Sequence, residues 1–223
     1  MNPDWLPWLL QVNDSQFPTG AYSHSMGLEE LTRRGLIRTP EDLETFLQKQ
    51  ILPSLLAFEI PFLARSHDAA RAADVTGLRQ LDEELDAWKL ADELRQASRQ
   101  LGSRRLSLIL KLDPDALIQS YAASDPPGHH IIVCALELRR LPVTAACCAY
   151  VYQVMSGFTS ASMKLIRIGQ ERCQSILRKN MTAAAPEIAL AVSRKDGKIG
   201  WFNPLIEIAG MRHARAHERL FIS

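Results

Sequence analysis

Apolar side chains recur at helical spacing along almost the whole chain. The clearest run places Leu78, Leu81, Leu85 and Trp88 on one face of a helix and acidic residues largely on the other. Strand patterns, in which apolar and polar residues alternate, are scarce, and the sequence contains no internal repeat. The pattern predicts an all-α fold, a single helical domain of about ten helices over residues 1–223.

Proline and glycine indicate where these helices begin and end. Thr39 can cap a helix whose first turn contains Pro40, and Asp113-Pro114 repeats that arrangement. Gly157 predicts a break between two closely packed helices. Other expected features are a bend or a break at Pro53, a kink at Pro61, a loop over 124–130, separate helices over 171–181 and 186–192, a last helix from about 203 to near Glu218, and a short tail over 219–223.

Composition is that of a globular protein, with 47% hydrophobic and 23% charged residues. No apolar run approaches the roughly 20 residues needed to span a bilayer, and the N-terminus lacks the basic start of a signal peptide. We therefore expect a cytoplasmic protein without membrane contact. The four cysteines show no CxxC spacing and predict reduced thiols, with Cys147 and Cys148 as small core residues.

Charge is unevenly distributed, although the formal net charge is only +1. Residues 1–95 carry 9 Lys/Arg and 16 Asp/Glu, whereas residues 96–223 carry 17 and 9, so the two parts sum to −7 and +8. Intramolecular pairing, different partners on different faces, or solvated surfaces alone can each produce this split. The basic residues form no stripe interleaved with aromatics, which argues against nucleic-acid binding.

Sequence signatures of catalysis are mostly absent. Gly197-Lys198 lacks the other residues of a phosphate-binding loop, and GAYSHSMG lacks the GxSxG spacing of a nucleophile elbow. His213 and His217 can share one helical face, but two ligands do not close a structural metal site, although they could contribute to a weak or interfacial nickel site. His129-His130 lies in the predicted loop, where we expect surface exposure.

The segment SQFPTGAYSHSMGLEE, residues 15–30, combines a proline with two glycines just before a helix-forming run. Pro18 stiffens the chain and Gly20 permits a turn. Gly27 can let the following helix approach another backbone closely. Taken alone, the segment is explained by a tight helix entrance.

Four segments, in this order, resemble the UreF family of urease accessory proteins over nearly the whole chain. FPTGAYSHSMGLE resembles the family's opening pattern, and ELRQASRQLG resembles its Glu-x-Arg-x-x-Ser-x-x-x-Gly helix. KLIRIGQERCQSIL resembles its central element, and HERLFIS resembles its terminus. Arg167, where the family commonly has proline, and Cys173, where it has a second glycine, depart from the pattern.

The resemblance implies an all-helical, dimeric protein without a catalytic centre. It implies binding to UreD (UreH in some systems) and to the GTPase UreG, in a complex that delivers nickel to apo-urease. The implied mechanism is scaffolding, with nickel in transit and no stably bound cofactor or metal. Two alternatives remain: a helical adaptor for other partners, and a hydrolase or metalloenzyme that uses His213, His217 and Glu218.

The resemblance also implies which residues contact partners. An internal Glu/Arg network explains Glu93 and Arg95 as well as partner contact does, and the neutral amides of the central element can bind a partner backbone without a large desolvation cost. The apolar pair at the terminus, in a tail too short to form its own core, is expected to become ordered on a neighbour. The implied partner-binding residues are Gly20, Ser23, Gly27, Glu29, Arg95, Gln170, Gln174, His217, Glu218, Arg219, Leu220 and Phe221.

Overall fold

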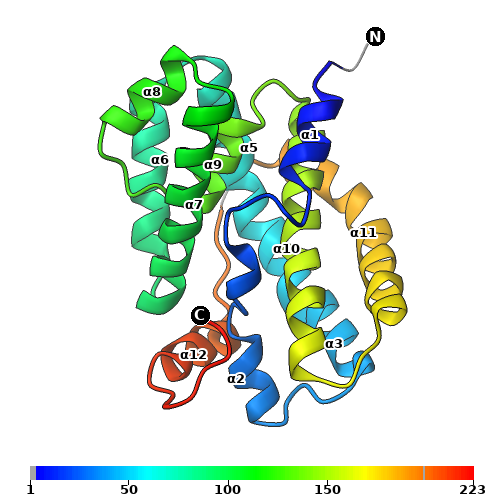
Figure 1. The fold of residues 1–223 in the computed structure, drawn as a ribbon. Helices are drawn as coiled ribbons and strands as arrows, with labels where there is room; N and C mark the ends of the chain where they lie inside the picture. Colours follow the sequence, from blue (N-terminus) through cyan, green and yellow to red (C-terminus); the bar gives the residue numbers. More distant parts are fainter. Residues whose placement is uncertain (1–3, 198) are drawn as a thin grey trace.

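The computed structural model describes residues 4–197 and 199–223, and every regular element in those residues is helical (Figure 1). The prediction of an all-α fold is confirmed. If the unbroken helical run over 40–71 is counted as one bent helix, the twelve α-helical segments make ten helices. The segments are α1 (Leu6–Val12), α2 (Leu28–Arg33), α3 (Pro40–Phe46), α4 (Leu52–Ser54), α5 (Ile60–Arg71), α6 (Val75–Trp88), α7 (Asp92–Leu112), α8 (Ala116–Ala123), α9 (His130–Glu137), α10 (Val143–Leu165), α11 (Gln170–Ser193) and α12 (Pro204–His213), with a 3-10 turn η1 (Ala21–Ser23) and two π segments, η2 (Leu47–Ile51) and η3 (Leu55–Glu59).

The bent helix over 40–71 contains both predicted prolines. Pro53 follows η2 and Pro61 follows η3. A proline ring clashes with the carbonyl four residues earlier, here Lys49 and Ala57, and the wider π turn makes room for it. The helix bends at these places without ending.

The carbonyl groups of the two π turns hold a distant segment of the chain. Ala57 accepts a hydrogen bond from the backbone N–H of Gly200 at 3.4 Å, and Gln50 accepts one from the Asn203 side chain at 3.2 Å. The segment leading into α12 therefore rests on the bent helix.

The core is centred on α9, which packs against α5 and α7 (Figure 1). All residues from Ile131 to Leu136 are at most 1% exposed. A buried ion pair lies beside them, with Arg105 Nη2 on α7 2.6 Å from Glu137 Oε2 on α9. Arg105 also donates to Gln153 on α10 at 2.8 Å, so one guanidinium links three helices.

Two expected helix boundaries are absent. The break predicted at Gly157 does not occur, and α10 continues through it. Among the described residues, no atom outside the helix lies within 4 Å of the position of an added Cβ. The separate helices predicted over 171–181 and 186–192 form one helix, α11, which contains Pro186. Packing against α5 and α10 buries Ala184 and Ile188 on either side of that proline and maintains the helix.

Two other boundaries are shifted. Thr39 caps α3 as predicted, but α8 begins at Ala116, with Asp115 rather than Asp113 as its cap. The last helix ends at His213 instead of near Glu218. The chain beyond it is held by hydrogen bonds to other elements, described below, and not by a continuing helix.

Candidate functional site

The segment around η1 and α2, the first turn of α7, the end of α12 and the tail over 219–223 meet at one place (Figure 1). Gly27 caps α2 with φ +86°, in the left-handed region that favours glycine. A Cβ there would lie 3.2 Å from the Cβ of Ala209 on α12. The close approach predicted for Gly27 is therefore observed, and its partner helix is α12.

Glu29 on α2 binds the backbone of the tail. Its Oε1 accepts the N–H of Leu220 at 2.8 Å, and its Oε2 accepts the N–H of Phe221 at 3.1 Å. Burial alone would raise the pKa of Glu29, but hydrogen bonds from Leu220, His213 and Phe221 outweigh it and lower that pKa. The carboxylate is therefore stabilised in its charged form by the contacts that hold the tail.

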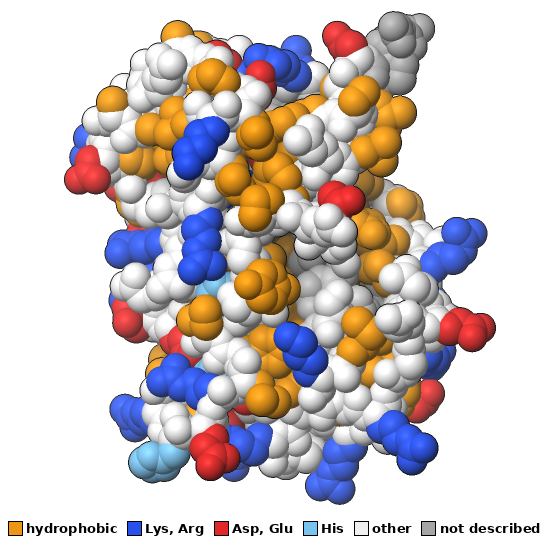
Figure 2. Space-filling model, viewed as in Figure 1, with side chains coloured by type: hydrophobic (Ala, Val, Ile, Leu, Met, Phe, Trp, Pro, Cys, Tyr) orange, Lys and Arg blue, Asp and Glu red, His pale blue; other side chains and the backbone are white. Residues whose placement is uncertain are grey.

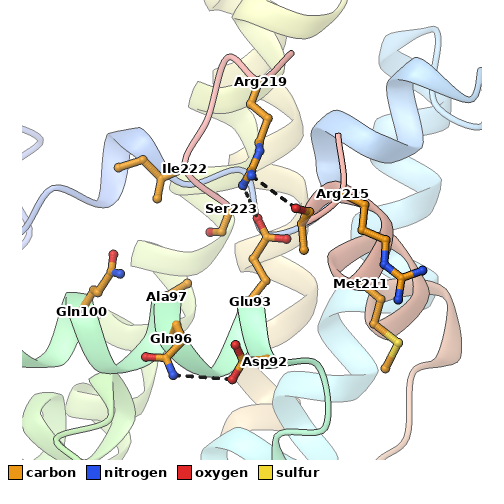
Figure 3. Close-up of a pocket in the computed structure, with 11 residues that line it drawn as sticks. Asp92, Glu93, Gln96, Ala97, Gln100, Met211, Arg215, Arg219, Ile222 and Ser223 are labelled. Carbon is orange, nitrogen blue, oxygen red and sulfur yellow. Dashed lines mark hydrogen bonds and ion pairs between the residues drawn. The ribbon is translucent and has the colours of Figure 1, made fainter. Parts of the chain in front are cut away.

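His213, which is 2% exposed, lies between two carboxylates at the end of α12. Its Nε2 is 2.9 Å from Glu29 Oε2, and its Nδ1 is 2.6 Å from Glu93 Oε1 on α7. Arg219 Nη1 lies 3.5 Å from Glu93 Oε1 (Figure 3), so the guanidinium also faces the carboxylate that contacts His213. We call Glu29, Glu93, His213 and Arg219 the tail cluster.

The tail also pairs with the opening segment of the chain. The Ser223 carbonyl accepts backbone N–H groups from Ser25 and Met26, and the Ile222 N–H donates to the Ser23 carbonyl at 2.8 Å. The Ser223 hydroxyl is 2.7 Å from His24 Nδ1. These contacts fix the end of the tail next to η1.

Side chains of the tail alternate between the interior and solvent. Phe221 is 4% exposed, and Lys164 Nζ lies 5.3 Å from its ring centroid. Leu220 and Ile222 are 71% and 49% exposed. The expectation that the Leu-Phe pair becomes ordered only on a neighbour is wrong for Phe221, which packs within its own chain, whereas Leu220 remains available.

A pocket of about 350 Å³ lies between α7, α12 and the tail (Figure 3). Its lining mixes apolar and charged side chains. Glu93 Oε2 is buried and, among the described residues, has no hydrogen-bond partner. The residues that line the pocket are Asp92, Glu93, Gln96, Ala97, Gln100, Met211, Ala214, Arg215, Arg219, Ile222 and Ser223.

The C-terminal end of the segment ELRQASRQLG, which we call the second motif, contacts a different site, the turn before α9. A Cβ at Gly102 would lie 1.9 Å from the carbonyl oxygen of Gly128, so α7 and this turn touch through bare backbone. Asp82 on α6 accepts the N–H groups of Gly128 at 2.7 Å and His129 at 3.0 Å, and the Tyr121 hydroxyl at 2.7 Å. Burial raises the pKa of Asp82.

His129 is fully buried, which contradicts the predicted exposure of this loop histidine. Its Nδ1 is 3.1 Å from Ser98 Oγ, and its Nε2 is 2.9 Å from Asp86 Oδ1. Burial lowers the pKa of His129 to about 4. We call Asp82, Asp86, Ser98 and His129 the loop cluster. Its serine is only 7% exposed, so the Ser-His-Asp order serves packing and gives no substrate access.

Other residues implied by the opening and second motifs have local contacts. Gly20 has φ +78°, and a Cβ there would overlap the guanidinium of Arg104. The Ser23 hydroxyl donates to the Gly20 carbonyl at 2.7 Å. Arg95 donates to Asp92 at 2.9 Å and to the Lys89 carbonyl at 3.3 Å, within the first turn of α7 and the turn before it.

Gln170 and Gln174 are exposed on the first turns of α11, which lie across the molecule from α12 (Figure 1). Cys173, between them, is buried against α10, where Thr159 and Ser162 accept or share its weak hydrogen bonds. A small side chain fits this contact between helices. The departing residue Arg167 is exposed.

His217 and Glu218 are exposed beyond the end of α12, so the helical pairing of His213 with His217 does not form. Across residues 4–197 and 199–223, no group of three or more His, Cys, Asp or Glu side chains is arranged to hold a metal ion. No helix in the same residues is long and apolar enough to cross a membrane.

Sequence reasoning missed the central role of His213 and the Ser223 contacts. For Glu93 the sequence left open whether the side chain belongs to an internal network or contacts a partner, and the structure shows internal contacts. The partners of His213 lie 120 and 184 positions away, so no local spacing reveals them. The available signal was a histidine within the expected last helix, for which the sequence suggested at most a contribution to a weak or interfacial nickel site.

Comparison with known proteins identifies the family. The UreF family model matches residues 37–180. Proteins named urease accessory protein UreF are 32% identical in Paenarthrobacter aurescens strain TC1, with 96% of each chain covered, and 31% identical in Arthrobacter sp. strain FB24, also with 96% of each covered. The protein of that name in Trichormus variabilis is 27% identical over 96% of this chain and 94% of its own. The chain belongs to the UreF family of urease accessory proteins.

Proposed function

We propose that this chain is a scaffold that bridges UreD, called UreH in some systems, and the GTPase UreG while nickel is inserted into apo-urease. The observation that carries the proposal is the similarity to a protein named urease accessory protein UreF over 96% of the chain. UreF accessory proteins are non-catalytic, and the role is in urease maturation. The protein works in the cytoplasm as a homodimer.

The mechanism is one of positioning. The tail cluster holds an exposed pair of apolar side chains next to α12, and the exposed amides of Gln170 and Gln174 supply a second, separate surface. Two surfaces on a rigid helical core allow one protein to hold two partners at a fixed separation. We assign the first surface to UreD and the second to UreG.

Nickel is cargo in this proposal, and GTP is bound by UreG. The nitrogens of His213 are occupied by two carboxylates, which leaves His217 as the exposed imidazole of this region. We therefore assign the chain no resident metal. The scaffold couples the nucleotide state of UreG to the release of nickel by holding the partners together.

Co-expression with UreD and UreG tests the proposal. We expect the three proteins to co-purify and the complex to activate apo-urease when nickel and GTP are both supplied. Omission of this chain should abolish activation. A different helical adaptor would associate with neither partner, and a metalloenzyme would show turnover or retain stoichiometric metal alone.

A further inference from the structure

A second cavity, of about 570 Å³, lies between α1, the end of α5 and the loop between α9 and α10. It shares no residue with the tail cluster or the loop cluster. A cavity of this size can hold a small organic molecule. We call it the N-terminal pocket, and the charged and aromatic residues that line it are Asp4, Trp5, Trp8, Arg71, Arg139 and Arg140.

Two indole rings form the side of the pocket that belongs to α1. Trp5 precedes the first turn of α1 and Trp8 lies within it; both are half-buried and pack against the core. Trp8 Nε1 donates to the Glu137 carbonyl at the end of α9 at 3.4 Å, so this side of the pocket is tied to α9. Figure 2 shows apolar side chains over α1, with basic side chains above them at the loop between α9 and α10. Aromatic faces that are held in place suit a flat ring.

Two of the arginines are held by aspartates that do not themselves line the pocket. Arg139 is 7% exposed; its Nη1 donates to the Leu136 carbonyl at 2.8 Å, and its Nη2 pairs with Asp115. Arg140 is exposed, and its Nη1 lies 3.1 Å from Asp113 Oδ2. A guanidinium carries five N–H groups, so these contacts orient both side chains and still leave donors for a ligand.

The third arginine, Arg71, is exposed at the end of α5 and forms no ion pair with any residue that the structure describes. The carbonyl groups of the last turn of α5 accept the backbone N–H groups of residues 72–74 instead. Asp68, three residues earlier, pairs with Lys195. The pocket therefore offers one unpaired positive charge together with the remaining donors of Arg139 and Arg140.

This charge arrangement restricts the class of ligand. A cation would be repelled by three guanidinium groups, and a purely apolar molecule would leave them without partners. Asp4 in the lining, with Asp113 and Asp115 behind it, limits the net positive charge, so a polyphosphate is not favoured. A single phosphate group can accept from guanidinium groups on two walls of the pocket at once.

We propose that the N-terminal pocket binds a small molecule that carries one phosphate group and a flat ring, the class to which nucleoside monophosphates belong. Arg71 and Arg140 bind the phosphate from opposite elements, with Arg139 beside them. The ring stacks on the indoles of Trp5 and Trp8. The inference goes beyond the proposed function and does not rest on it.

Calorimetric titration of the full chain tests the ligand class, with adenosine 5′-monophosphate as the probe. Adenosine supplies the ring alone, inorganic phosphate the anion alone, and benzoate a ring with a carboxylate. We expect the monophosphate to bind about tenfold or more tightly than any of the three, because only it engages both sides of the pocket. Higher salt should weaken its binding, since the contact is with exposed charges.

Two variants test the assigned contacts. Arg71→Gln removes the unpaired charge from an exposed side chain, and we expect it to weaken monophosphate binding about fivefold or more while adenosine binding stays unchanged. Trp5→Leu keeps an apolar side chain but removes the stacking surface, and it should weaken both. The matched control is Arg212→Gln, an exposed arginine on α12 at the other end of the molecule (Figure 1), which should change neither affinity.

Several results would overturn the inference. Absence of monophosphate binding at about 1 mM would remove the site. Equal affinity for inorganic phosphate would show that the ring makes no contact, and tighter binding of benzoate would replace the phosphate with a carboxylate. An equal loss of affinity in Arg212→Gln and Arg71→Gln would reduce the binding to a general effect of charge. Because the assay contains no UreD or UreG, none of these results bears on the scaffold proposal.

Discussion

The tail cluster and the loop cluster use the same interaction for different purposes. In each, one carboxylate accepts two consecutive backbone N–H groups from a distant segment: Glu29 holds Leu220 and Phe221, and Asp82 holds Gly128 and His129. Asp82 is fully buried, and its segment packs inward. Glu29 is at the edge of the fold, and its segment leaves two apolar side chains in solvent.

The difference shows that a hydrogen-bonding motif does not by itself indicate function. The loop cluster fastens a turn to α7 and strengthens the core, whereas the tail cluster fixes a segment that can contact another molecule. α7 connects the two sites, since it carries Glu93 at one end of the shared motif and Gly102 at the other. The second motif therefore contributes both to core packing and to the placement of the tail.

The largest effect is expected where the backbone of α7 touches the turn before α9. Gly102→Ala should destabilise the fold by about 3 kcal/mol or more, because the new methyl group would overlap the Gly128 carbonyl. Urea unfolding measures the change. Gly157→Ala, in the open middle of α10, is the matched control and should stabilise by about 0.5 to 1 kcal/mol. Equal effects of the two changes would contradict the assigned close contact.

The next largest effect is a difference in stability between substitutions on the buried and the exposed sides of the tail. Phe221→Ala should cost about 2 to 3 kcal/mol, less than at a central core site because the tail can detach locally. Leu220→Ala should change stability by no more than about 0.5 kcal/mol. Thermal unfolding of both variants tests this. Deletion of residues 219–223 should lower both stability and partner binding, so Leu220→Ala is the more specific probe of docking.

A smaller loss is expected when the buried carboxylate of the loop cluster is neutralised. Asp82→Asn should cost about 2 kcal/mol, because its amide nitrogen would face one of three hydrogen-bond donors. UreD affinity should stay within twofold of wild type. A large loss of affinity in a folded Asp82→Asn protein would remove the functional distinction between the two clusters.

The smallest expected effect is a difference in how the two clusters respond to acid. The pKa of Glu29 is lowered in the folded protein, so its contribution is complete above the ordinary value of 4.5 and is lost as the pH falls through the lower folded value. The pKa of Asp82 is raised, so its own titration favours folding as the pH falls, but the pKa of His129 is lowered by burial to about 4, so protonation of that imidazole opposes folding of the loop cluster below the ordinary value of 6.5. Between pH 6.5 and 4.5, where Glu29 keeps its charge, hydrogen exchange corrected for its intrinsic rate should therefore show earlier loss of protection at His129 than at Phe221. The reverse order would contradict the assignment.

Local features of the sequence predicted most of the helical fold. The cap at Thr39 and the irregular helix at Pro53 and Pro61 were identified because capping and proline geometry act over four or five residues. Gly157 and Pro186 were misleading, since long helices tolerate both when neighbouring helices supply packing on their other faces. The motif residues Gly27 and Glu29 were assigned to a surface from resemblance, but their contacts with α12 and the tail were not foreseen.

The sequence by itself determined that the chain is helical and that its motifs are those of the UreF family, because periodicity and motif order are properties of neighbouring residues. Only the tertiary structure decided that His213 bridges two carboxylates, that Phe221 turns inward and that Leu220 remains outside. These contacts join residues more than a hundred positions apart, and a buried charge is stable only where the fold delivers its partners.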